Sequence, residues 1–399
     1  MNKLRIFYCR TVQTVFRVAI PFLPYRKPKI LLDVQEVSDL LTDKGKRRVL
    51  IVTDSMLHKA GLLETLKTSL TAAGISYFIY DKTVPNPTIN NVEESVSMYR
   101  KNGCQAIIAF GGGSSMDCAK ATGARIAKPR QSIQRMAGVM KIWKKTPMLI
   151  AVPTTAGTGS ETTVTAVITD DATHHKQTIN AFALIPEYAL LDYKLTVGLP
   201  KALTATTGMD ALTHAVEAYI GGSTTKESRA MAVETVSLVY KYLKIAYSQP
   251  DNKEAREGML HAAYCAGLAF SKSYVGYVHA VAHSLGGQYK IPHGLANSVL
   301  LPIVLEIYGE SCHRRLANLA RKSGVVVYGY SDKETSERFI AWIKQMNSSM
   351  SIPEKLEGIQ DDDIDVMAYH ADKEANPLYP VPMEMDRNEL KEIYKKVQA

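Results

Sequence analysis

The chain has 399 residues, of which 46% are hydrophobic and 22% are charged, and its formal net charge is +9. This composition is typical of a globular protein with room for two domains, and it excludes the disordered and fibrous classes. No uncharged apolar run reaches about 18 residues, so we expect no membrane-spanning segment.

The first 29 residues form a basic segment that contains no acidic residue. Its seven basic residues are Lys3, Arg5, Arg10, Arg17, Arg26, Lys27 and Lys29. A helix here would place Lys3, Arg10 and Arg17 on one face and would end at Pro21. One interpretation is an amphipathic anchor for a membrane surface or a cleaved targeting segment. The interpretation we favour is a terminal helix that docks on its own protein or on a partner subunit.

Alternating apolar runs and helical stretches predict a mostly parallel α/β domain over residues 30–199. The predicted strands are 48–53, 76–80, 106–110 and 148–152, and the predicted helices are 57–73, 88–100 and a helix that begins near Met116. Helical periodicity then dominates residues 211–247, 252–272 and most of the remainder, which predicts an all-helical domain over residues 200–399. The run Asp361–Asp363 marks a solvated turn or a helix start.

Two loops that follow predicted strands have the residues of a nucleotide site. Gly111, Gly112 and Gly113 lie between an apolar strand and a helix start, where the backbone N–H groups can bind a pyrophosphate. This is not the usual dinucleotide fingerprint, and such turns also occur for packing alone. The second loop, residues 153–160, carries three threonines, and loops at the carboxyl ends of parallel strands converge.

Asp54 ends the first clear strand. A carboxylate there accepts a ribose hydroxyl and repels a 2′-phosphate, which favours NAD over NADP, although an aspartate in this place is as often a helix cap.

Potential metal donors gather between residues 210 and 293. Asp210 and His214 lie one helical turn apart, His279 and His283 repeat that spacing, and His293 follows Pro292. These donors are oxygen and nitrogen only, so a closed thiolate zinc site is excluded, and Zn²⁺, Fe²⁺, Co²⁺ or Ni²⁺ all suit the set. We expect some subset of the five to bind a metal. The isolated histidines are core or surface residues in our interpretation: His58, His174, His175, His261, His313 and His370.

With these segments in view, the chain resembles the iron-containing (group III) alcohol dehydrogenase family over about residues 30–399. The resemblance implies an α/β dinucleotide-binding domain with a Rossmann-like sheet and an all-α metal-binding domain of the dehydroquinate synthase-like type. It implies a cleft between them for NAD(P) and one divalent metal, Fe²⁺ before Zn²⁺. The implied metal ligands are Asp210, His214, His279 and His293, and His283 then lies near the nicotinamide.

The resemblance also implies the residues that contact the cofactor. They are Asp54, Asn86, Gly112, Gly113, Ser114, Ser115, Met116, Asp117, Thr154, Thr155, Thr158 and Lys176. Ser115 stands where many relatives have proline. Lys176 and Glu217 are possible contacts of the metal ligands or of the cofactor, with an alternative interpretation as plain surface charges.

The activity implied is hydride transfer between an alcohol and NAD(H) beside the metal, with His283 or a water chain carrying the proton. Two alternatives remain. One is a polyol or sugar-phosphate reaction in the same superfamily, and the other is a non-enzymatic protein in which the metal only holds the two domains together. A phosphorylated substrate would require basic residues, for which Lys272 and Lys290 are the candidates. Aromatic residues such as Phe270, Tyr274 and Tyr277 shape the substrate pocket or belong to the core.

The expected partners and compartment follow from composition. We expect a small alcohol or aldehyde as substrate, a homo-oligomer such as a dimer, and no nucleic acid, because the later basic residues are mixed with acids. The five cysteines are odd in number and show no CxxC spacing, which fits a reducing, cytoplasmic compartment.

Overall fold

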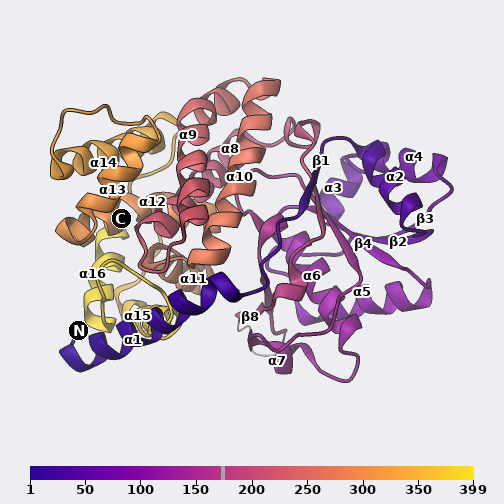
Figure 1. Cartoon of the computed structure of the whole chain (residues 1–399), viewed down its shortest axis with the longest axis horizontal. Coiled ribbons are helices and arrows are strands. Elements are labelled where there is room, and N and C mark those ends of the chain that lie inside the picture. The colour runs from indigo at the N-terminus through magenta and orange to yellow at the C-terminus, as the bar shows by residue number, and fades with distance from the viewer. Residues whose placement is uncertain (172–175) are drawn as a thin grey trace. The chain divides into compact units, whose positions relative to one another are not determined.

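The computed structural model describes residues 1–171 and 176–399, so His174 and His175 lie outside the described residues. The chain forms two compact units (Figure 1). The first, called the α/β unit below, runs from Pro24 to Gly198. The second, called the helical unit, combines Met1–Leu23 with Leu199–Ala399. The first 23 residues therefore group with the C-terminal helices.

A six-stranded parallel sheet forms the centre of the α/β unit, with the strand order β1-β9-β6-β4-β2-β3. Its strands are β1 (Lys29–Leu31), β2 (Arg48–Val52), β3 (Ser76–Tyr80), β4 (Ala106–Gly111), β6 (Met148–Pro153) and β9 (Tyr188–Leu190). Every residue of β4 and β6 is buried, as expected for continuous apolar runs at the centre of a parallel sheet.

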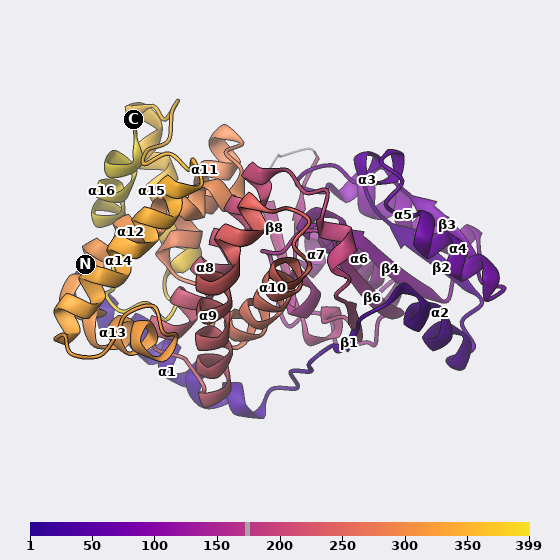
Figure 2. The same ribbon diagram turned by 90° about the horizontal axis from the view of Figure 1, so that it is seen from above.

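Helices cover both faces of this sheet (Figure 2). They are α2 (Val34–Asp43), α3 (Ser55–Lys59), α4 (Glu64–Ala72), α5 (Ile89–Lys101), α6 (Gly113–Ala127) and α7 (Ile133–Met136). Alternate residues of β2 point to opposite faces. Val49 and Ile51 share one apolar core with α2 and α4, whereas Leu50 and Val52 share another with α5 and α6.

The strand order reverses beside β2, because the chain passes from β2 to β3 on one side and then to β4 on the other. In open α/β sheets a ligand binds at the carboxyl ends of the strands at such a point. The residues that follow β2 and β4 are therefore the ones expected to meet a ligand.

The helical unit contains nine helices after residue 199 in the described residues. They are α8 (Lys201–Ile220), α9 (Lys226–Ser248), α10 (Lys253–Ser273), α11 (Tyr277–Tyr289), α12 (His293–Tyr308), α13 (His313–Lys322), α14 (Asp332–Ser349), α15 (Asp361–Ala375) and α16 (Arg387–Val397). Every residue of α8 from Gly208 to Ile220 is buried, so this helix runs through the core of the unit. Together with the parallel sheet, these helices confirm the predicted fold class.

Local differences from the sequence-based expectation have simple causes. The predicted helix 57–73 is wrong as a single helix, because Gly61 adopts a φ of 76° and separates α3 from α4. The stretch 211–247 is likewise two helices, since Gly221 ends α8 and a capping box of Thr225 with Ser228 starts α9. Asp361 begins α15, with three acidic residues in its first turn that suit the helix dipole.

A small second sheet, which the sequence did not predict, has the order β5-β8-β7. It consists of β5 (Gly138–Val139), β7 (Thr165–Thr169) and β8 (Lys176–Asn180).

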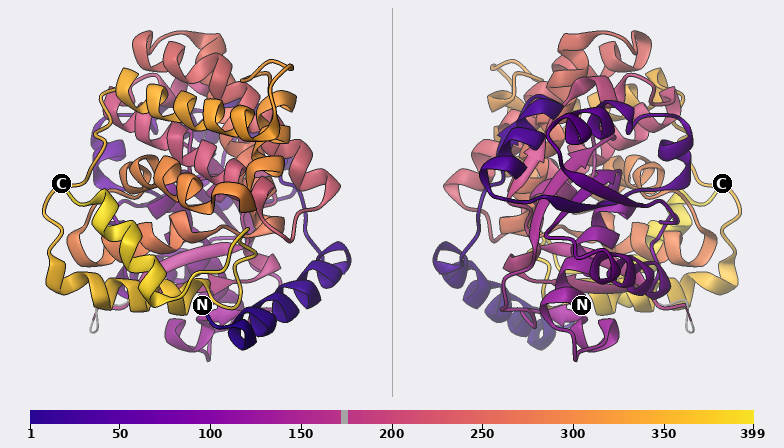
Figure 3. Two further views of the ribbon diagram at one scale, coloured as in Figure 1. Left: turned by 90° about the vertical axis from the view of Figure 1, so that its left-hand side faces the viewer. Right: turned by 90° about the vertical axis from the view of Figure 1, so that its right-hand side faces the viewer.

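The N-terminal segment forms α1 (Lys3–Ala19), which packs on the helical unit of its own chain (Figure 3, left). Arg5 Nη2 donates to both carboxylate oxygens of Asp372, at 2.6 and 2.8 Å. Gln13 Nε2 donates to the Tyr379 carbonyl at 2.9 Å and to Glu384 at 3.0 Å. In the described residues, no helix combines the length and the apolar character needed to cross a membrane.

Close packing of α9 on α10 depends on Gly258. A Cβ at this position would lie 2.2 Å from Cδ2 of the Tyr242 ring, whose hydroxyl is held by Glu254 at 2.6 Å. We predict that Gly258→Ala lowers the urea midpoint, because an overpacking cost of about 1–3 kcal/mol exceeds the gain of about 1 kcal/mol in helix propensity. Gly287→Ala in α11 is the matched control, since nothing lies within 4 Å of its Cβ, and it should raise the midpoint. Equal gains in both variants would contradict the prediction.

Candidate metal centre and cofactor loops

Four potential metal donors converge within the helical unit. Asp210 and His214 come from α8, His279 from α11, and His293 from the first residue of α12. One ligand atom from each of the four lies within 4.8 Å of the others. Asp210, His214 and His279 are buried, and His293 is partly exposed. The i, i+4 spacing on α8 thus places an oxygen and a nitrogen donor opposite those of two other helices.

The distances within this cluster fit a single ion. Nε2 of His293 lies 3.6 Å from Oδ1 of Asp210, and Nε2 of His279 lies 4.0 Å from the same oxygen. Two donors about 2.1 Å from an ion at a tetrahedral angle are about 3.4 Å apart. Nδ2 of Asn297 lies 2.7, 3.2 and 3.0 Å from these atoms of Asp210, His279 and His293. The three donor atoms therefore face one common point, as a metal site requires.

Glu217 fixes the orientation of His279. Its buried carboxylate accepts the backbone N–H groups of Gly276 and Val278, each at 2.8 Å, and lies 2.6 Å from Nδ1 of His279. Burial raises the pKa of Glu217 to about 8, against the opposing effect of the bonds from Gly276 and Val278. The interpretation of Glu217 as a surface charge is wrong. This contact turns Nε2 of His279 toward the other donors, as carboxylate partners of metal-binding histidines do.

Burial and neighbouring rings favour the neutral form of His279, the form that a metal ligand needs. Burial, and then the charges of His214, His293 and His283, hold the pKa of His279 well below its usual value. The ring of His214 stacks on Phe270 with 4.1 Å between centroids and on His279 with 4.4 Å. Phe270 therefore lies against a candidate ligand.

His283 lies beside the cluster but outside the group of four. Its Nδ1 is 2.6 Å from Oε1 of Glu374, and the Tyr379 hydroxyl donates to the same oxygen at 2.7 Å. The His283 ring stacks on that of His293 with 5.2 Å between centroids. Burial works to raise the pKa of Glu374, but His283 and the Tyr379 hydroxyl outweigh it and lower that pKa. The side chain of His283 is one-third exposed, so it is accessible to a proton donor.

The two predicted loops of the α/β unit lie side by side, because Gly111 at the end of β4 pairs with Pro153 at the end of β6. Gly112 precedes the first turn of α6, and a Cβ on Gly113 would approach Cγ2 of Thr158 to 3.1 Å. A Cβ on Gly112 would lie 3.5 Å from Thr155. Glycine at both positions thus lets the second loop pack against the helix start that offers N–H groups to an anion.

The other expected cofactor residues fall in several places. Asp54 caps α3, because its Oδ1 accepts the N–H groups of Met56 and Leu57. Asn86 has a φ of 58° in the turn before α5. Lys176 begins β8 of the small sheet. The remaining members lie in the two loops and the first turns of α6, where Ser115, Met116 and Thr154 are buried and Ser114 and Asp117 are partly buried.

A buried lysine joins α6 to the segment after the second loop. Nζ of Lys120 donates to Oγ of Ser160 at 3.0 Å and to Oγ1 of Thr163 at 2.7 Å, and it also contacts the carbonyls of Thr163 and Thr165. Ser160 in turn donates to Asp117 at 3.0 Å. Burial lowers the pKa of Lys120 to about 8, against the opposing charge of Asp117. This network joins α6, which follows the first loop, to the segment that follows the second loop.

The aromatic and basic residues considered for the substrate have distinct environments. Tyr277 is fully buried and its hydroxyl contacts Asn376 and Met385, so it is a core residue. Tyr274 contacts the ring of Phe16. Lys272 pairs with Glu227, and Lys290 is the C-terminal cap of α11.

Comparison with known proteins decides the family. The profile described as "Iron-containing alcohol dehydrogenase" matches residues 32–193, and "Fe-containing alcohol dehydrogenase family, C-terminal" matches residues 204–398. The chain belongs to the iron-containing alcohol dehydrogenase family. It is therefore an alcohol dehydrogenase of the iron-containing type, an oxidoreductase that uses a metal, as the resemblance implied.

Individual relatives of this family cover nearly the whole chain. The NAD-dependent methanol dehydrogenase of Bacillus methanolicus is 38% identical over 340 residues, which are 85% of this chain and 89% of that protein. The 1,3-propanediol dehydrogenase of Klebsiella pneumoniae is 36% identical over 385 residues, or 96% and 98% of the two chains. A crystal structure of a 1,3-propanediol oxidoreductase matches with a TM-score of 0.89 and 34% identity, covering 94% and 98%.

Several residues around the site were missed by reasoning from the sequence. Asn297 lies four residues after His293, and Lys120 three after Asp117. Each is one helical turn from a candidate site residue, and a search at that spacing would find them. Glu374 carries no such signal, because it lies 91 residues from His283.

We predict that Lys120→Met lowers the free energy of unfolding by about 2–4 kcal/mol, since several buried oxygens lose a charged donor. It should also weaken NAD binding roughly tenfold by loosening the two loops. Fluorescence titration and urea denaturation measure the two effects. Lys101→Met, at an exposed position of α5, is the control. If the free energy of unfolding of Lys120→Met equalled that of the wild type, the Lys120 network would not stabilise the fold.

Proposed function

We propose that this dehydrogenase interconverts short, unphosphorylated alcohols and their aldehydes, and that a single Fe²⁺, with Zn²⁺ as the second choice, is held by Asp210, His214, His279 and His293. The observation that carries the assignment is the convergence of these four donor atoms, with Glu217 locking His279 in the ligand orientation. Nitrogen and oxygen donors of this kind suit either metal.

The metal, NAD and the side chains of His283, Glu374 and Tyr379 have separate roles in the proposed reaction. The metal, when bound, supplies a Lewis acid that acidifies an alcohol and polarises a carbonyl. NAD supplies the hydride acceptor. Because Nδ1 of His283 faces Glu374, Nε2 is the nitrogen that takes the alcohol proton. Glu374 stabilises the resulting imidazolium, and Tyr379 holds Glu374 in place.

The loops after β2, β4 and β6 bind NAD in this proposal. The α6 start and Thr154, Thr155 and Thr158 hold the pyrophosphate. Asp54 serves both as a helix cap and as a ribose ligand, because its two cap bonds go to Oδ1 and leave Oδ2 for a hydroxyl. Its charge repels a 2′-phosphate, so we propose NAD rather than NADP. Asn86 and Lys176 complete the proposed cofactor contacts.

The substrate proposal rests on charge and on the relatives. Lys272 pairs with Glu227, so it does not supply a cation for a phosphate group. Phe270 offers an apolar surface beside His214. Two relatives are named for methanol and 1,3-propanediol. We therefore place short alcohols ahead of sugar phosphates.

Two further expectations enter the proposal. We propose a homo-oligomer, most simply a dimer, in the reducing cytoplasm. Among the described residues the five buried cysteines form no disulfide bond, which supports a reducing compartment.

Replacing His279 tests the metal assignment. We predict that His279→Ala loses both bound iron and turnover, because it removes a ligand and leaves Glu217 buried without its partner. Iron content by elemental analysis and NADH absorbance over a panel of alcohols and aldehydes measure the two losses. His261→Ala in α10 is the matched control and should retain both. A fully active His279→Ala enzyme would contradict the proposal. Tight iron binding by the wild type without turnover of any substrate would favour a purely structural metal.

Replacing Glu374 tests the proton route. We predict that Glu374→Gln lowers kcat by roughly 10–100-fold while iron content stays at one per chain, since only the partner of His283 is lost. The solvent deuterium isotope effect on kcat should rise. Glu306→Gln, in a surface pair with Lys344, is the control. An unchanged kcat in the Glu374 variant would remove His283 and Glu374 from the proton route.

A further inference from the structure

Helix α1 presents an apolar row to solvent. Leu4, Phe7, Tyr8, Val15, Val18 and Phe22, the last in the short turn Ile20–Phe22, are between 57% and 85% exposed, and we call these six residues the outer face. Among the described residues they are six of nineteen exposed large hydrophobic side chains, although they lie within 22 of 399 positions. Their spacing of three and four residues forms one stripe along the helix.

The polar groups within this stripe are satisfied by the helix itself. The Thr11 hydroxyl donates to the Phe7 carbonyl at 2.8 Å, and the Thr14 hydroxyl donates to the Arg10 carbonyl at 2.7 Å. Neither hydroxyl requires water to complete its hydrogen bonds. The outer face can therefore enter an apolar environment without the usual cost of an unpaired polar group.

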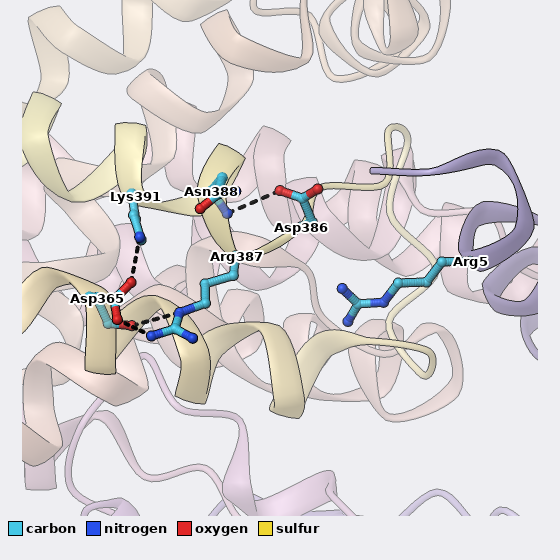
Figure 4. Close-up of a pocket in the computed structure, with 6 residues that line it drawn as sticks. All are labelled: Arg5, Asp365, Asp386, Arg387, Asn388 and Lys391. Atoms are coloured by element: carbon cyan, nitrogen blue, oxygen red, sulfur yellow. Dashed lines mark hydrogen bonds and ion pairs between the residues drawn. The ribbon is translucent and has the colours of Figure 1, made fainter.

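The opposite side of α1 docks through both apolar and polar contacts, because Cys9 and Ile20 are buried there and Phe16 contacts the ring of Tyr274. Arg5 binds Asp372, and Gln13 binds Glu384, so the side toward the protein is also held by charge and hydrogen bonds. Figure 4 shows Arg5 beside a pocket lined by the ends of α15 and α16. In this pocket Arg387 and Lys391 both pair with Asp365. A surface helix ordinarily keeps its apolar residues on the side toward the protein, whereas α1 carries apolar residues on both sides.

Basic residues flank the outer face on one side. Lys3, Arg10 and Arg17 recur every seven residues, and Arg10 lines a pocket with Glu310, Arg314 and Arg315. Burial, and then repulsion by Arg314, Arg10, Arg229 and Arg17, lowers the pKa of Arg315, which shows that five arginines gather here. Glu384 neutralises Arg10. Among the described residues, Arg17, Arg229 and Arg314 form no ion pair, so the flank keeps a net positive charge.

We propose that the outer face of α1 inserts into the surface of an anionic lipid bilayer, with Lys3, Arg17 and the neighbouring arginines at the level of the headgroups. An apolar stripe beside a basic flank is the pattern of a helix that lies in the membrane interface. Charge favours this occupant over a second copy of the chain, because α1 has no acidic residue to oppose the basic flank of another α1.

Vesicle flotation of the full chain tests the proposal. We expect the protein to float with vesicles of phosphatidylcholine mixed with phosphatidylglycerol, to stay behind with phosphatidylcholine alone, and to be released by high salt. Phe7→Ser with Val15→Ser should weaken binding at least roughly tenfold, because apolar insertion is lost. Arg17→Gln should weaken it roughly fivefold through the loss of one charge near the surface. Melting temperatures should not change, since these side chains make no buried contact.

Control variants and size measurements separate the alternatives. Val327→Ser with Tyr328→Ser removes equally exposed apolar groups elsewhere in the helical unit and should leave flotation unchanged. Flotation that persists in the Phe7 and Val15 double variant would overturn the proposal. So would an absence of flotation in the wild type. If light scattering showed that the double variant is a smaller assembly and the wild type did not float, the outer face would be a contact between copies.

Discussion

The buried carboxylate of Glu217 is the constraint on which the helical unit depends. It lies on α8, yet it accepts both N–H groups at the start of α11 and contacts the ring of His279, so one side chain joins two helices and orients a ligand. Gly276 is required beside it, because a Cβ there would lie 2.7 Å from Oε1. A carboxylate buried without such partners would cost several kcal/mol. The same side chain, Glu217, is therefore needed both for the connection between α8 and the start of α11 and for the geometry of the candidate metal centre.

In the α/β unit a buried positive charge, that of Lys120, likewise joins segments that are separate in the sequence. Lys120 is buried in α6, and its ammonium group is surrounded by oxygens from the segment that follows the second loop. The parallel pairing of β4 with β6 brings the two loops to the same edge, but pairing alone does not set the distance between them. Lys120 and Asp117 add a further link, through Ser160, between the elements that follow the two loops. In each unit one buried charged side chain, Glu217 or Lys120, connects elements that are distant in sequence. The residues beside that side chain remain accessible to a ligand.

The sequence predicted those features that depend on local periodicity. The central strands and most helices follow from apolar runs of the right length, and the i, i+4 spacing of Asp210 and His214 pointed to the group of four donors that the structure brings together. Strands of three residues such as β1 and β9 are too short to carry a pattern. Glu217 had two interpretations, a contact of the site or a surface charge, and periodicity could not decide between them because α8 is buried on all sides. Glu374 depends on the tertiary fold, which no local spacing reports.

Helix α1 illustrates how two interpretations of one segment can both apply. The favoured one, a helix docked on its own protein, describes the side that carries Arg5 and Gln13. That side is held by hydrogen bonds, by ion pairs and by the buried Cys9 and Ile20, and a second set of apolar residues is left on the outer face. Because none of these docking contacts uses the outer face, the helix keeps its place on the protein while this second apolar side stays available.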